Sequence, residues 1–381
     1  EFLLIRRVCE DFPRAVFPFC SENVILIGMM RTKIVKVDEF HMDQEAIREA
    51  GEILRSGGLV AFPTETVYGL GANGLNEEAA AKIYAAKGRP SDNPLILHIT
   101  CMEELRPLAA EISPRAEALA EAFWPGPMTM IFKKTDLVPH TTTGGLDTVA
   151  VRMPSHPVAR ALIRAAGVPI AAPSANTSGR PSPTKAAHVI EDMDGRIDMI
   201  VDGGEVGIGL ESTIIDVSEG TPSVLRPGYI TMEKLRKVIG TVTVDQASLG
   251  QMAPGVRPKA PGMKYRHYAP RAEMTLFRGS EKASVRAIRK ALAEAAAEGK
   301  KAGVICTEES FDCYEAPVKK CVGSRKDPEM IAHNLYDVLR AFDGEGVDCI
   351  FSESFDDNPL SGAIMNRLVK AAGHRIVECQ E

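Results

Sequence analysis

The sequence lacks the features of several protein classes. It has no apolar run long enough to cross a bilayer, which argues against a membrane protein. None of its eight cysteines forms a C-x-x-C pair, and no histidine cluster lies beside them, which argues against a zinc site and a disulfide framework. We therefore expect a protein of the reducing cytoplasm. The formal net charge of −6 argues against non-specific binding of nucleic acid, so any phosphate site must be a local basic pocket.

The usual signatures of nucleotide-binding and hydrolytic enzymes are missing as well. There is no G-x-x-x-x-G-K-[ST] loop, no G-x-S-x-G, no H-E-x-x-H and no kinase signature set. Gly69, Gly71 and Gly74 do spell the dinucleotide-binding pattern G-x-G-x-x-G. We reject it because Pro63 and a polar stretch separate the glycines from the preceding strand, and the acidic residue expected roughly 20 positions later is missing. An ATP-using enzyme of this sequence must hold the phosphates with dispersed cations, hydroxyls and backbone donors.

Strand-like and helix-like segments alternate along the first two thirds of the chain, which predicts an α/β fold. The predicted strands are 32–37, 59–62, 95–99, 128–133, 148–152, 168–172, 198–202 and 213–217, and the predicted helices are 43–57, 76–87, 113–123 and 155–166. Their lengths do not fix the order of strands in the sheet.

The composition also predicts how the chain divides. Residues 241–271 are rich in proline and glycine with little periodicity, which predicts an extended linker. After it, strands and helices alternate again and predict a smaller Rossmann-like α/β domain over 272–381. We thus expect a catalytic domain over 30–240, a linker or lid over 241–271 and a C-terminal domain. Residues 1–29 show no clear period, and we expect a non-native or disordered extension before Met30.

Two cations, Lys87 and Arg89, come at the end of the predicted helix 76–87. Lys87 follows Ala80, Ile83 and Tyr84 at helical spacing, so it falls on the apolar face. One explanation is a lysine that complements the helix dipole with its stem packed inward. We favour an anion ligand aimed into a cleft, because two cations on a rigid turn suit a phosphate or carboxylate.

Polar side chains also crowd the ends of other predicted strands, where α/β proteins bind ligands. Each group has a structural alternative: a polar turn, a surface salt bridge for an arginine, or a patch that docks two domains. The groups are Thr64, Glu65 and Thr66; Ser174, Asn176, Thr177, Ser178 and Ser182; Ser212 and Thr213; Arg152 and Arg226; and the basic, aromatic patch 264–268 within the linker. Aromatic and cationic groups on a mobile segment suit a lid over a nucleotide.

Taken together, these motifs resemble those of YrdC-like domains, in the same order. They are FPTETVYGLG at 62–71, KGRPSDNPL at 87–95, WPGP at 124–127, AVRMP at 150–154, PSANTSG at 173–179, ESTI at 211–214 and LRPG at 225–228. The later PGMKYRHYAP at 261–270 and AIMNRL at 363–368 resemble the longer, two-domain threonylcarbamoyl-adenylate synthases. The resemblance covers residue 30 to the end. It implies a YrdC-like twisted mixed sheet with helices, followed by the smaller Rossmann-like domain.

The resemblance also implies a reaction. L-threonine and bicarbonate or CO2 would give a carbamate, which attacks the α-phosphate of ATP. Threonylcarbamoyl-AMP and pyrophosphate would form, and the product would pass to the proteins that modify tRNA beside the anticodon. We expect Mg²⁺ on the ATP phosphates and no protein metal site. We expect neither membrane association nor strong direct binding of nucleic acid.

Residue roles follow as hypotheses. Lys87 and Arg89 would be catalytic and would bridge the carbamate or carboxylate and the phosphate. The residues predicted to bind ATP are Lys87, Arg89, Ser91, Asn93, Ser174, Asn176, Ser182, Arg226, Tyr265 and His267. The residues predicted to bind threonine are Thr64, His98, Arg152, Ser212 and Thr213.

Three other functions are weaker. An RNA-binding module on the same basic surface is disfavoured by the net charge and the additional domain. An enzyme that adenylates free carbamate also uses YrdC-like domains, but with zinc-finger cysteines that this sequence lacks. An oxidoreductase would rest only on the rejected glycine pattern.

Overall fold

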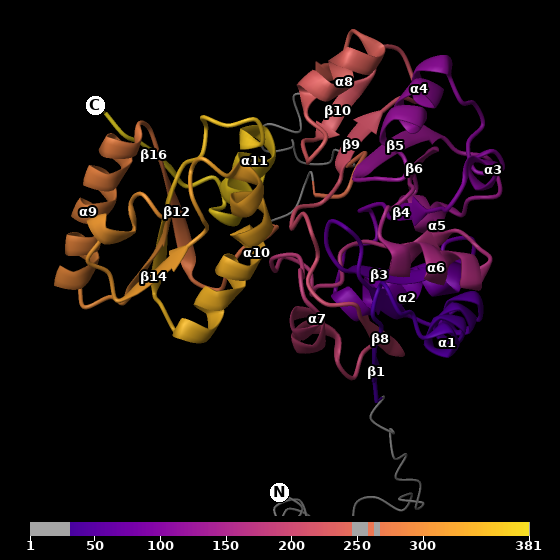
Figure 1. Cartoon of the computed structure of the whole chain (residues 1–381), viewed down its shortest axis with the longest axis horizontal. Helices are drawn as coiled ribbons and strands as arrows, with labels where there is room; N and C mark the ends of the chain where they lie inside the picture. Colours follow the sequence, from indigo (N-terminus) through magenta and orange to yellow (C-terminus); the bar gives the residue numbers. More distant parts are fainter. Residues whose placement is uncertain (1–30, 246–257, 263–266, 381) are drawn as a thin grey trace, which may run out of the picture. The chain divides into compact units, whose positions relative to one another are not determined.

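A computed structural model describes residues 31–245, 258–262 and 267–380 (Figure 1). Local sequence signals set where its helices begin and end. The Asn76 side chain accepts a hydrogen bond from the Ala79 amide at the start of α2 (Glu77–Lys87), and Gly88 ends that helix with a left-handed φ of 60°. Asp43 caps α1 (Gln44–Arg55) in the same way. The predicted helices 43–57 and 76–87 therefore agree with the structure to within two residues at each end.

The larger sheet has eleven strands and is mixed, as predicted. Its order is β1-β8-β2-β3-β7-β4-β6-β5-β9-β10-β11. Pairs β1/β8, β2/β8, β4/β6, β5/β9 and β10/β11 are parallel, and the other five are antiparallel. The strands are β1 (Lys33–Lys36), β2 (Val60–Phe62), β3 (Gly69–Asn73), β4 (Ile96–His98), β5 (Met128–Lys133), β6 (Thr148–Arg152), β7 (Ile170–Ala171), β8 (Met199–Asp202), β9 (Thr213–Asp216), β10 (Ser223–Arg226) and β11 (Thr243–Val244).

Helices cover both faces of this sheet, because alternate strand residues point to opposite sides. Val60 and Phe62 pack with α1 and α6 (Pro157–Ala166), whereas Leu59 and Ala61 belong to the core on the other face. That second core includes α2, α4 (Pro114–Phe123), α7 (Ala186–Met193) and α8 (Met232–Ile239). The short helices α3 (Met102–Leu105) and α5 (His140–Thr143) complete this part.

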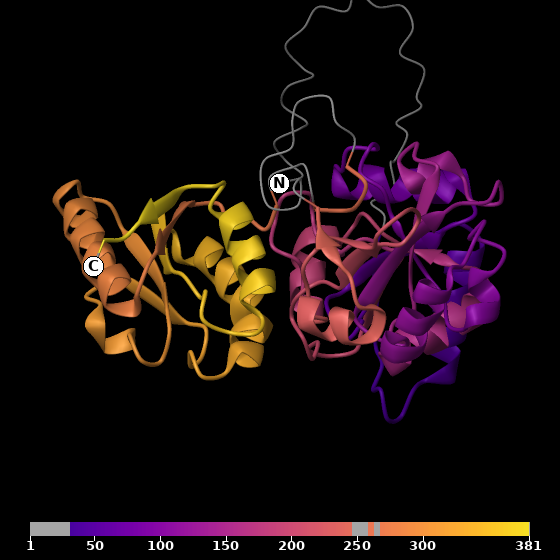
Figure 2. The ribbon, with the colours of Figure 1, turned by 90° about the horizontal axis from the view of Figure 1, so that it is seen from above.

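The smaller sheet is parallel throughout, with the order β14-β13-β15-β12-β16. Its strands are β12 (Glu273–Arg278), β13 (Ala302–Cys306), β14 (Val318–Cys321), β15 (Cys349–Glu353) and β16 (Ile376–Glu378). Helix α9 (Glu281–Ala297) covers one face, and α10 (Pro328–Glu345) and α11 (Ser361–Ala371) cover the other (Figures 1 and 2). A short 3₁₀ helix spans Phe311–Cys313. The α/β character agrees with the prediction, whereas the central strands are ordered differently from dinucleotide-binding folds, so the Rossmann-like classification stays a prediction.

Strand β11 of the larger sheet lies within the predicted linker 241–271, and β12 of the smaller sheet begins just after it. Both sheets belong to one compact unit that spans residues 31–381. The domain boundaries at 240 and 271 stay a prediction. Gly209, before β9, lies directly against α10: a Cβ atom added there would be 2.5 Å from both Cα and O of His333. Gly209 also has a φ of +83°, which side chains rarely adopt. Only a glycine therefore allows this close approach of the loop to the helix.

Several elements were not predicted from the sequence. They are β3, β10, β11, β14, β16 and helices α3, α5, α7 and α8. Gly69 and Gly71 lie within strand β3, so they do not form the phosphate-binding turn of a dinucleotide site, and the rejection of that pattern is confirmed. Among the described residues, no helix is long and apolar enough to cross a membrane.

Candidate active site

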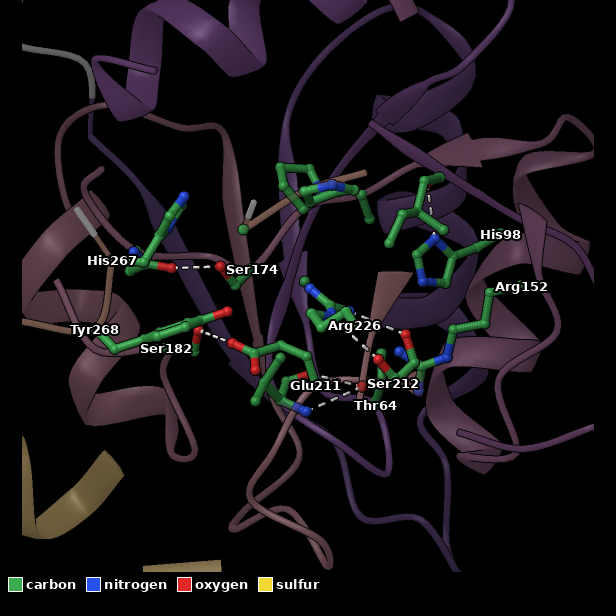
Figure 3. Close-up of a pocket in the computed structure, with 18 of the residues that line it drawn as sticks. Thr64, His98, Arg152, Ser174, Ser182, Glu211, Ser212, Arg226, His267 and Tyr268 are labelled. Atoms are coloured by element: carbon green, nitrogen blue, oxygen red, sulfur yellow. Dashed lines mark hydrogen bonds between the residues drawn. The ribbon is translucent and has the colours of Figure 1, made fainter. Parts of the chain in front are cut away.

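One pocket joins residues that lie far apart in the sequence (Figure 3). The space between its walls is about 600 Å³ when the solvent at its open mouth is included. The lining residues are Thr64, Val67, Gly69, Arg89, Ile96, His98, Arg152, Ala172, Pro173, Ser174, Asn176, Ser182, Glu211, Ser212, Arg226, Pro261, Gly262, His267 and Tyr268. Several polar lining residues, such as Thr64, Arg152 and Ser174, end a strand of the large sheet or follow one closely, which is where α/β proteins bind ligands.

His98 and Arg152 form one side of the pocket (Figure 3). They end the parallel strands β4 and β6 in direct register, which brings the two side chains together. Arg152 is buried, and its guanidinium lies 2.8 Å from the Glu65 carboxylate. Burial and the charge of Arg152 lower the pKa of His98 to about 3, so the imidazole is neutral at physiological pH. This side combines one buried guanidinium with neutral polar groups, which suits a small molecule with a carboxylate.

Ser174, Ser182, His267 and Tyr268 lie on the opposite side (Figure 3). Burial, reinforced by the charge of Arg89, lowers the pKa of His267 to about 3. The buried Nε2 of His267 has no hydrogen-bond partner among the described residues. A neutral imidazole with an unused nitrogen and nearby hydroxyls offers hydrogen bonds to a ligand without adding charge.

The turn that carries Ser174 is shaped by the amide of Asn176. Its Nδ2 donates to the carbonyl oxygens of Thr177 at 2.8 Å and Arg180 at 3.0 Å. Its Oδ1 accepts a hydrogen bond from the Ser174 hydroxyl. The Asn176 side chain therefore stabilises the backbone conformation of this turn. Asn176 also lines the pocket.

Lys87 and Arg89 are buried cations. All the hydrogen bonds that the structure shows for their charged groups are donated to backbone carbonyls. The Lys87 ammonium donates to the carbonyl oxygens of Ser174 and Asn176. Arg89 donates to the carbonyls of Asn93 at 3.3 Å and Pro94 at 3.1 Å. Burial, followed by the charge of Arg89, holds the pKa of Lys87 well below its usual range, and burial lowers the pKa of Arg89 to about 10. Such a cation pair favours an incoming anion.

Arg226 and Glu211 lie between the two sides of the pocket (Figure 3). Arg226 donates from Nε to the Ser212 carbonyl at 3.1 Å and from Nη2 to the Ser212 hydroxyl at 3.2 Å. The Glu211 carboxylate accepts hydrogen bonds from Ser182, Tyr336 and Arg367. Burial acts to raise the pKa of Glu211, but the charges of Arg367 and Arg226 outweigh it and lower that pKa to about 2. Glu211 is therefore ionised throughout the physiological range.

The side chains that the structure describes around the pocket are not arranged to hold a metal ion. The described residues include no group of three or more histidine, cysteine, aspartate or glutamate side chains placed to hold a metal ion. Glu211, a carboxylate that lines the pocket, already accepts three hydrogen bonds. A divalent cation in this pocket would need ligands from a bound substrate.

Ten predicted site residues line this pocket, whereas four others do not. Ser91 is exposed on the surface, and the Asn93 carbonyl accepts from Arg89 behind the wall. Thr213 donates its hydroxyl to the Ile230 carbonyl at 2.8 Å, so it stabilises the fold beside the site. Lys87 lies behind Ser174 and Asn176, whose carbonyls it binds. A fifth, Tyr265, lies outside the described residues.

Sequence reasoning did not assign roles to two lining residues, Glu211 and Tyr268. Glu211 opens the ESTI segment, and an acidic residue at the start of a buried strand could have signalled it. Tyr268 belongs to the aromatic and basic patch 264–268, which was predicted to be a lid only as a group. Its ring lies 5.2 Å from the ring of Tyr336, measured between centroids.

The fold and the pocket define an α/β protein with a buried, cation-rich site for small anionic molecules, typical of an enzyme. Comparisons identify the family. Residues 52–228 match the family model described as "Telomere recombination", and residues 230–373 match the one described as "Threonylcarbamoyl-AMP synthase, C-terminal domain". The chain belongs to the threonylcarbamoyl-AMP synthase family.

Relatives from distant organisms support this membership over most of the chain. A threonylcarbamoyl-AMP synthase of Pyrococcus abyssi is 50% identical over 347 residues, which cover 91% of this chain and 99% of the relative. One from Bacillus subtilis is 49% identical and covers 91% and 100%. The crystal structure of P. abyssi Sua5 complexed with L-threonine matches with a TM-score of 0.87 at 50% identity, and covers 92% of this chain and 100% of that one.

Proposed function

We propose that this chain is a nucleotidyltransferase that forms threonylcarbamoyl-AMP from L-threonine, bicarbonate or CO2, and ATP. The observation that carries the proposal is a single pocket with two chemically different sides that meet at Arg226. In the reaction, a carbamate oxygen bonds to the α-phosphorus of ATP, the bond from that phosphorus to the bridging oxygen breaks, and pyrophosphate leaves. Both reactants must therefore lie in one cavity with their reacting atoms close together.

The side with Arg152 would take the amino acid. Its guanidinium matches a carboxylate, and Glu65 at 2.8 Å holds it in place. Thr64, His98 and Ser212 supply neutral polar groups beside it. P. abyssi Sua5 has been crystallised with L-threonine, which supports threonine as the amino acid here. Because His98 is neutral, it offers hydrogen bonds without repelling the ammonium group of a free amino acid.

The side with Ser174, Ser182 and His267 would take the nucleotide, with Arg89 and Arg226 toward its phosphates. Lys87 lies behind this side, where its ammonium donates to the carbonyls of Ser174 and Asn176, and it would act on the phosphates through its positive charge. Fixed cations in a buried site stabilise the negative charge that develops on the α-phosphate and the leaving pyrophosphate. These residues would act by binding and positioning, and no covalent intermediate with the enzyme is needed.

Magnesium would enter as part of the substrate MgATP, because the pocket walls lack a set of metal-binding carboxylates. The released threonylcarbamoyl-AMP would pass to proteins that modify tRNA beside the anticodon. A mixed anhydride of this type hydrolyses in water, so transfer to such a partner would follow promptly.

The direct test incubates purified protein with MgATP, bicarbonate and each amino acid in turn, and measures pyrophosphate together with the acyl-adenylate. We expect both products with L-threonine and neither without an amino acid. Release of pyrophosphate that is independent of threonine or of bicarbonate would contradict the proposal. Tight, salt-sensitive binding of RNA without ATP turnover would favour the RNA-binding alternative.

A further inference from the structure

Helices α10 and α11, which pack on the smaller sheet, direct polar side chains toward the pocket formed by the larger sheet. Tyr336 and Arg340 are four residues apart on α10, and Arg367 and Lys370 are three apart on α11, so each pair shares one helix face. All four side chains belong to buried residues. Long polar side chains are buried at such cost only when specific partners satisfy them.

Their partners are residues of the pocket wall or the residues next to it. Tyr336 donates its hydroxyl to Glu211 Oε2 at 2.8 Å, and Arg367 Nε lies 3.1 Å from the same oxygen. Lys370 donates to the Gly262 carbonyl at 2.6 Å. Arg340 donates to the carbonyl of Pro181, the residue before Ser182, at 2.7 Å. The smaller sheet thus braces the nucleotide side of the pocket at three places.

The contact between Arg367 and Glu211 is connected to the pocket, because Glu211 also binds Ser182. Arg367 binds both the side chain of Glu211 and, from Nη2 at 3.2 Å, its backbone carbonyl. The other carboxylate oxygen, Oε1, accepts the hydrogen of the Ser182 hydroxyl. An ionised carboxylate can only accept hydrogen bonds, so it fixes where the Ser182 hydrogen points. The lone pairs of Ser182 are then left for a donor in the pocket.

We propose that Arg367 is a positioning residue of the reaction, which acts through Glu211 to orient the Ser182 hydroxyl and the nucleotide side of the pocket. This inference rests on the proposed function. It gives the C-terminal α/β unit a specific role: its α11 supplies the counter-charge that keeps a pocket carboxylate ionised. Arg367 itself does not line the pocket.

The charges around Glu211 make this role measurable. The titratable or charged groups that face it come from every element packed around it: Arg226 of β10, His267 and Tyr268 of the connecting segment, Tyr336 of α10, and Arg367 and Lys370 of α11. Arg367 is the foremost of the charges that keep the pKa of Glu211 low. Without it, burial raises that pKa, and Glu211 takes up a proton as the pH falls.

The experiment compares full-length wild type with Arg367→Gln, Arg367→Lys and the double variant Glu211→Gln/Arg367→Gln. The matched control is Arg325→Gln, because Arg325 pairs with the buried Glu353 in the same α/β unit but away from the pocket. Threonine-dependent pyrophosphate release is measured from pH 5 to pH 9 at varied MgATP. Thermal unfolding is measured over the same range without substrate.

We expect Arg367→Gln to lose roughly 10–100-fold in kcat/KM for MgATP. Its activity should decline further as the pH falls, whereas wild type has no such acid limb. Arg367→Lys should keep the wild-type pH profile with a smaller loss, because the charge remains. The double variant has no carboxylate to titrate, so its acid limb should be absent. Arg325→Gln should lower the unfolding temperature but keep the wild-type profile and KM.

Three results would overturn the proposal: a wild-type KM and wild-type pH profile in Arg367→Gln, losses no larger than those of Arg325→Gln, or an acid limb that persists in the double variant. If Arg367→Gln does not fold, Tyr336→Phe carries the same test with a smaller effect, because it removes one hydrogen bond to Glu211. Thermal unfolding separates this inference from the proposed function. The stability gap between wild type and Arg367→Gln should narrow toward pH 5 as Glu211 becomes protonated, even if no substrate turns over. A gap that does not change with pH would count against the linkage.

Discussion

The molecule contains two sets of buried cations that differ in what they bind. Those of the pocket side, Lys87, Arg89 and Arg226, form hydrogen bonds to backbone carbonyls and to one serine hydroxyl. Those of the smaller α/β part, the buried Arg340 and Arg367 together with the partly exposed Arg325, bind the carboxylates of Asp192, Glu211 and Glu353, respectively. Burial lowers the pKa values of all three pocket cations, whereas the Glu211 carboxylate raises that of Arg367 against the effect of burial.

This difference separates cations that carboxylates of the fold compensate from cations that a bound anion would compensate. A buried cation with a carboxylate partner is compensated within the fold, and removal of either partner leaves the other uncompensated. A buried cation that meets only carbonyl oxygens stays costly until an anion arrives. The arginines paired with carboxylates should therefore support stability, and Arg367 should act on the pocket only through Glu211. Lys87, Arg89 and Arg226 should support binding and catalysis at some cost to stability.

The largest effect should come from Lys87→Met, which removes the charge and keeps the length of the side chain. We expect kcat/KM for threonine-dependent pyrophosphate release to fall by about 10²–10³-fold, since one charge-stabilising donor is lost. The free energy of unfolding should not decrease. The control is Lys82→Met on the same helix, an exposed lysine that donates to the Gly57 carbonyl at 2.7 Å. Undiminished activity in Lys87→Met would remove Lys87 from the mechanism.

The converse test is Arg325→Met, which leaves the buried Glu353 without its arginine. We expect a loss of about 3 kcal/mol in the free energy of unfolding, with kcat/KM unchanged in the folded protein. Chemical denaturation measures the first quantity. Arg375→Gln removes a more exposed ion pair with Glu273 and should cost under about 1 kcal/mol. Equal losses in the two variants would contradict the distinction between buried and exposed pairs.

Binding of an anion should stabilise the protein through the pocket cations. At a MgATP concentration of about 100 times Kd, the wild type should gain about 2.7 kcal/mol. Thermal shift assays without threonine measure this gain without catalysis. Lys87→Met should gain much less at the same concentration, and Lys82→Met should match the wild type. A ligand-induced shift that Lys87→Met retains in full would place the nucleotide elsewhere.

The smallest expected effect is the uptake of protons when MgATP binds. Burial lowers the pKa of Lys87, so an anion that binds beside it favours the charged form and raises that pKa again. Binding of MgATP should therefore take up a fraction of a proton, less than about one per site. Affinity should then increase as the pH falls toward neutral. Calorimetry in buffers of different ionisation enthalpy measures the uptake, and Lys87→Met should abolish it.

Much of the fold could be predicted because its signals are local. Caps and apolar spacing gave α1 and α2 to within two residues at each end. The prediction failed where neighbours in the sheet decide the structure. Strand β3 has the sequence GLGAN, which carries two glycines and no β-branched residue, and it forms because β2 and β7 pair with it. The order of strands is a non-local property that periodicity cannot supply.

A site residue could be predicted only where the sequence immediately around it carries a signal. Lys87 stood out because a lysine occupies the apolar face of a helix, and the structure places it in the interior. Arg367 had no such signal, because its partner Glu211 lies 156 positions earlier in the chain. Thr213 was predicted to be a ligand because of its neighbours, but its hydroxyl is used by Ile230. Polar composition shows where groups gather, and only the fold shows which remain available.

Gly209 has no side chain, but its size controls how closely α10 approaches the pocket. Any side chain there would act as a wedge between its loop and α10, since the backbone of His333 already occupies the space. The helix would move outward and carry the Tyr336 hydroxyl away from Glu211. Substitution of Gly209 should therefore inactivate the protein, as substitution of a substrate-binding residue would, although Gly209 has only a hydrogen atom in place of a side chain.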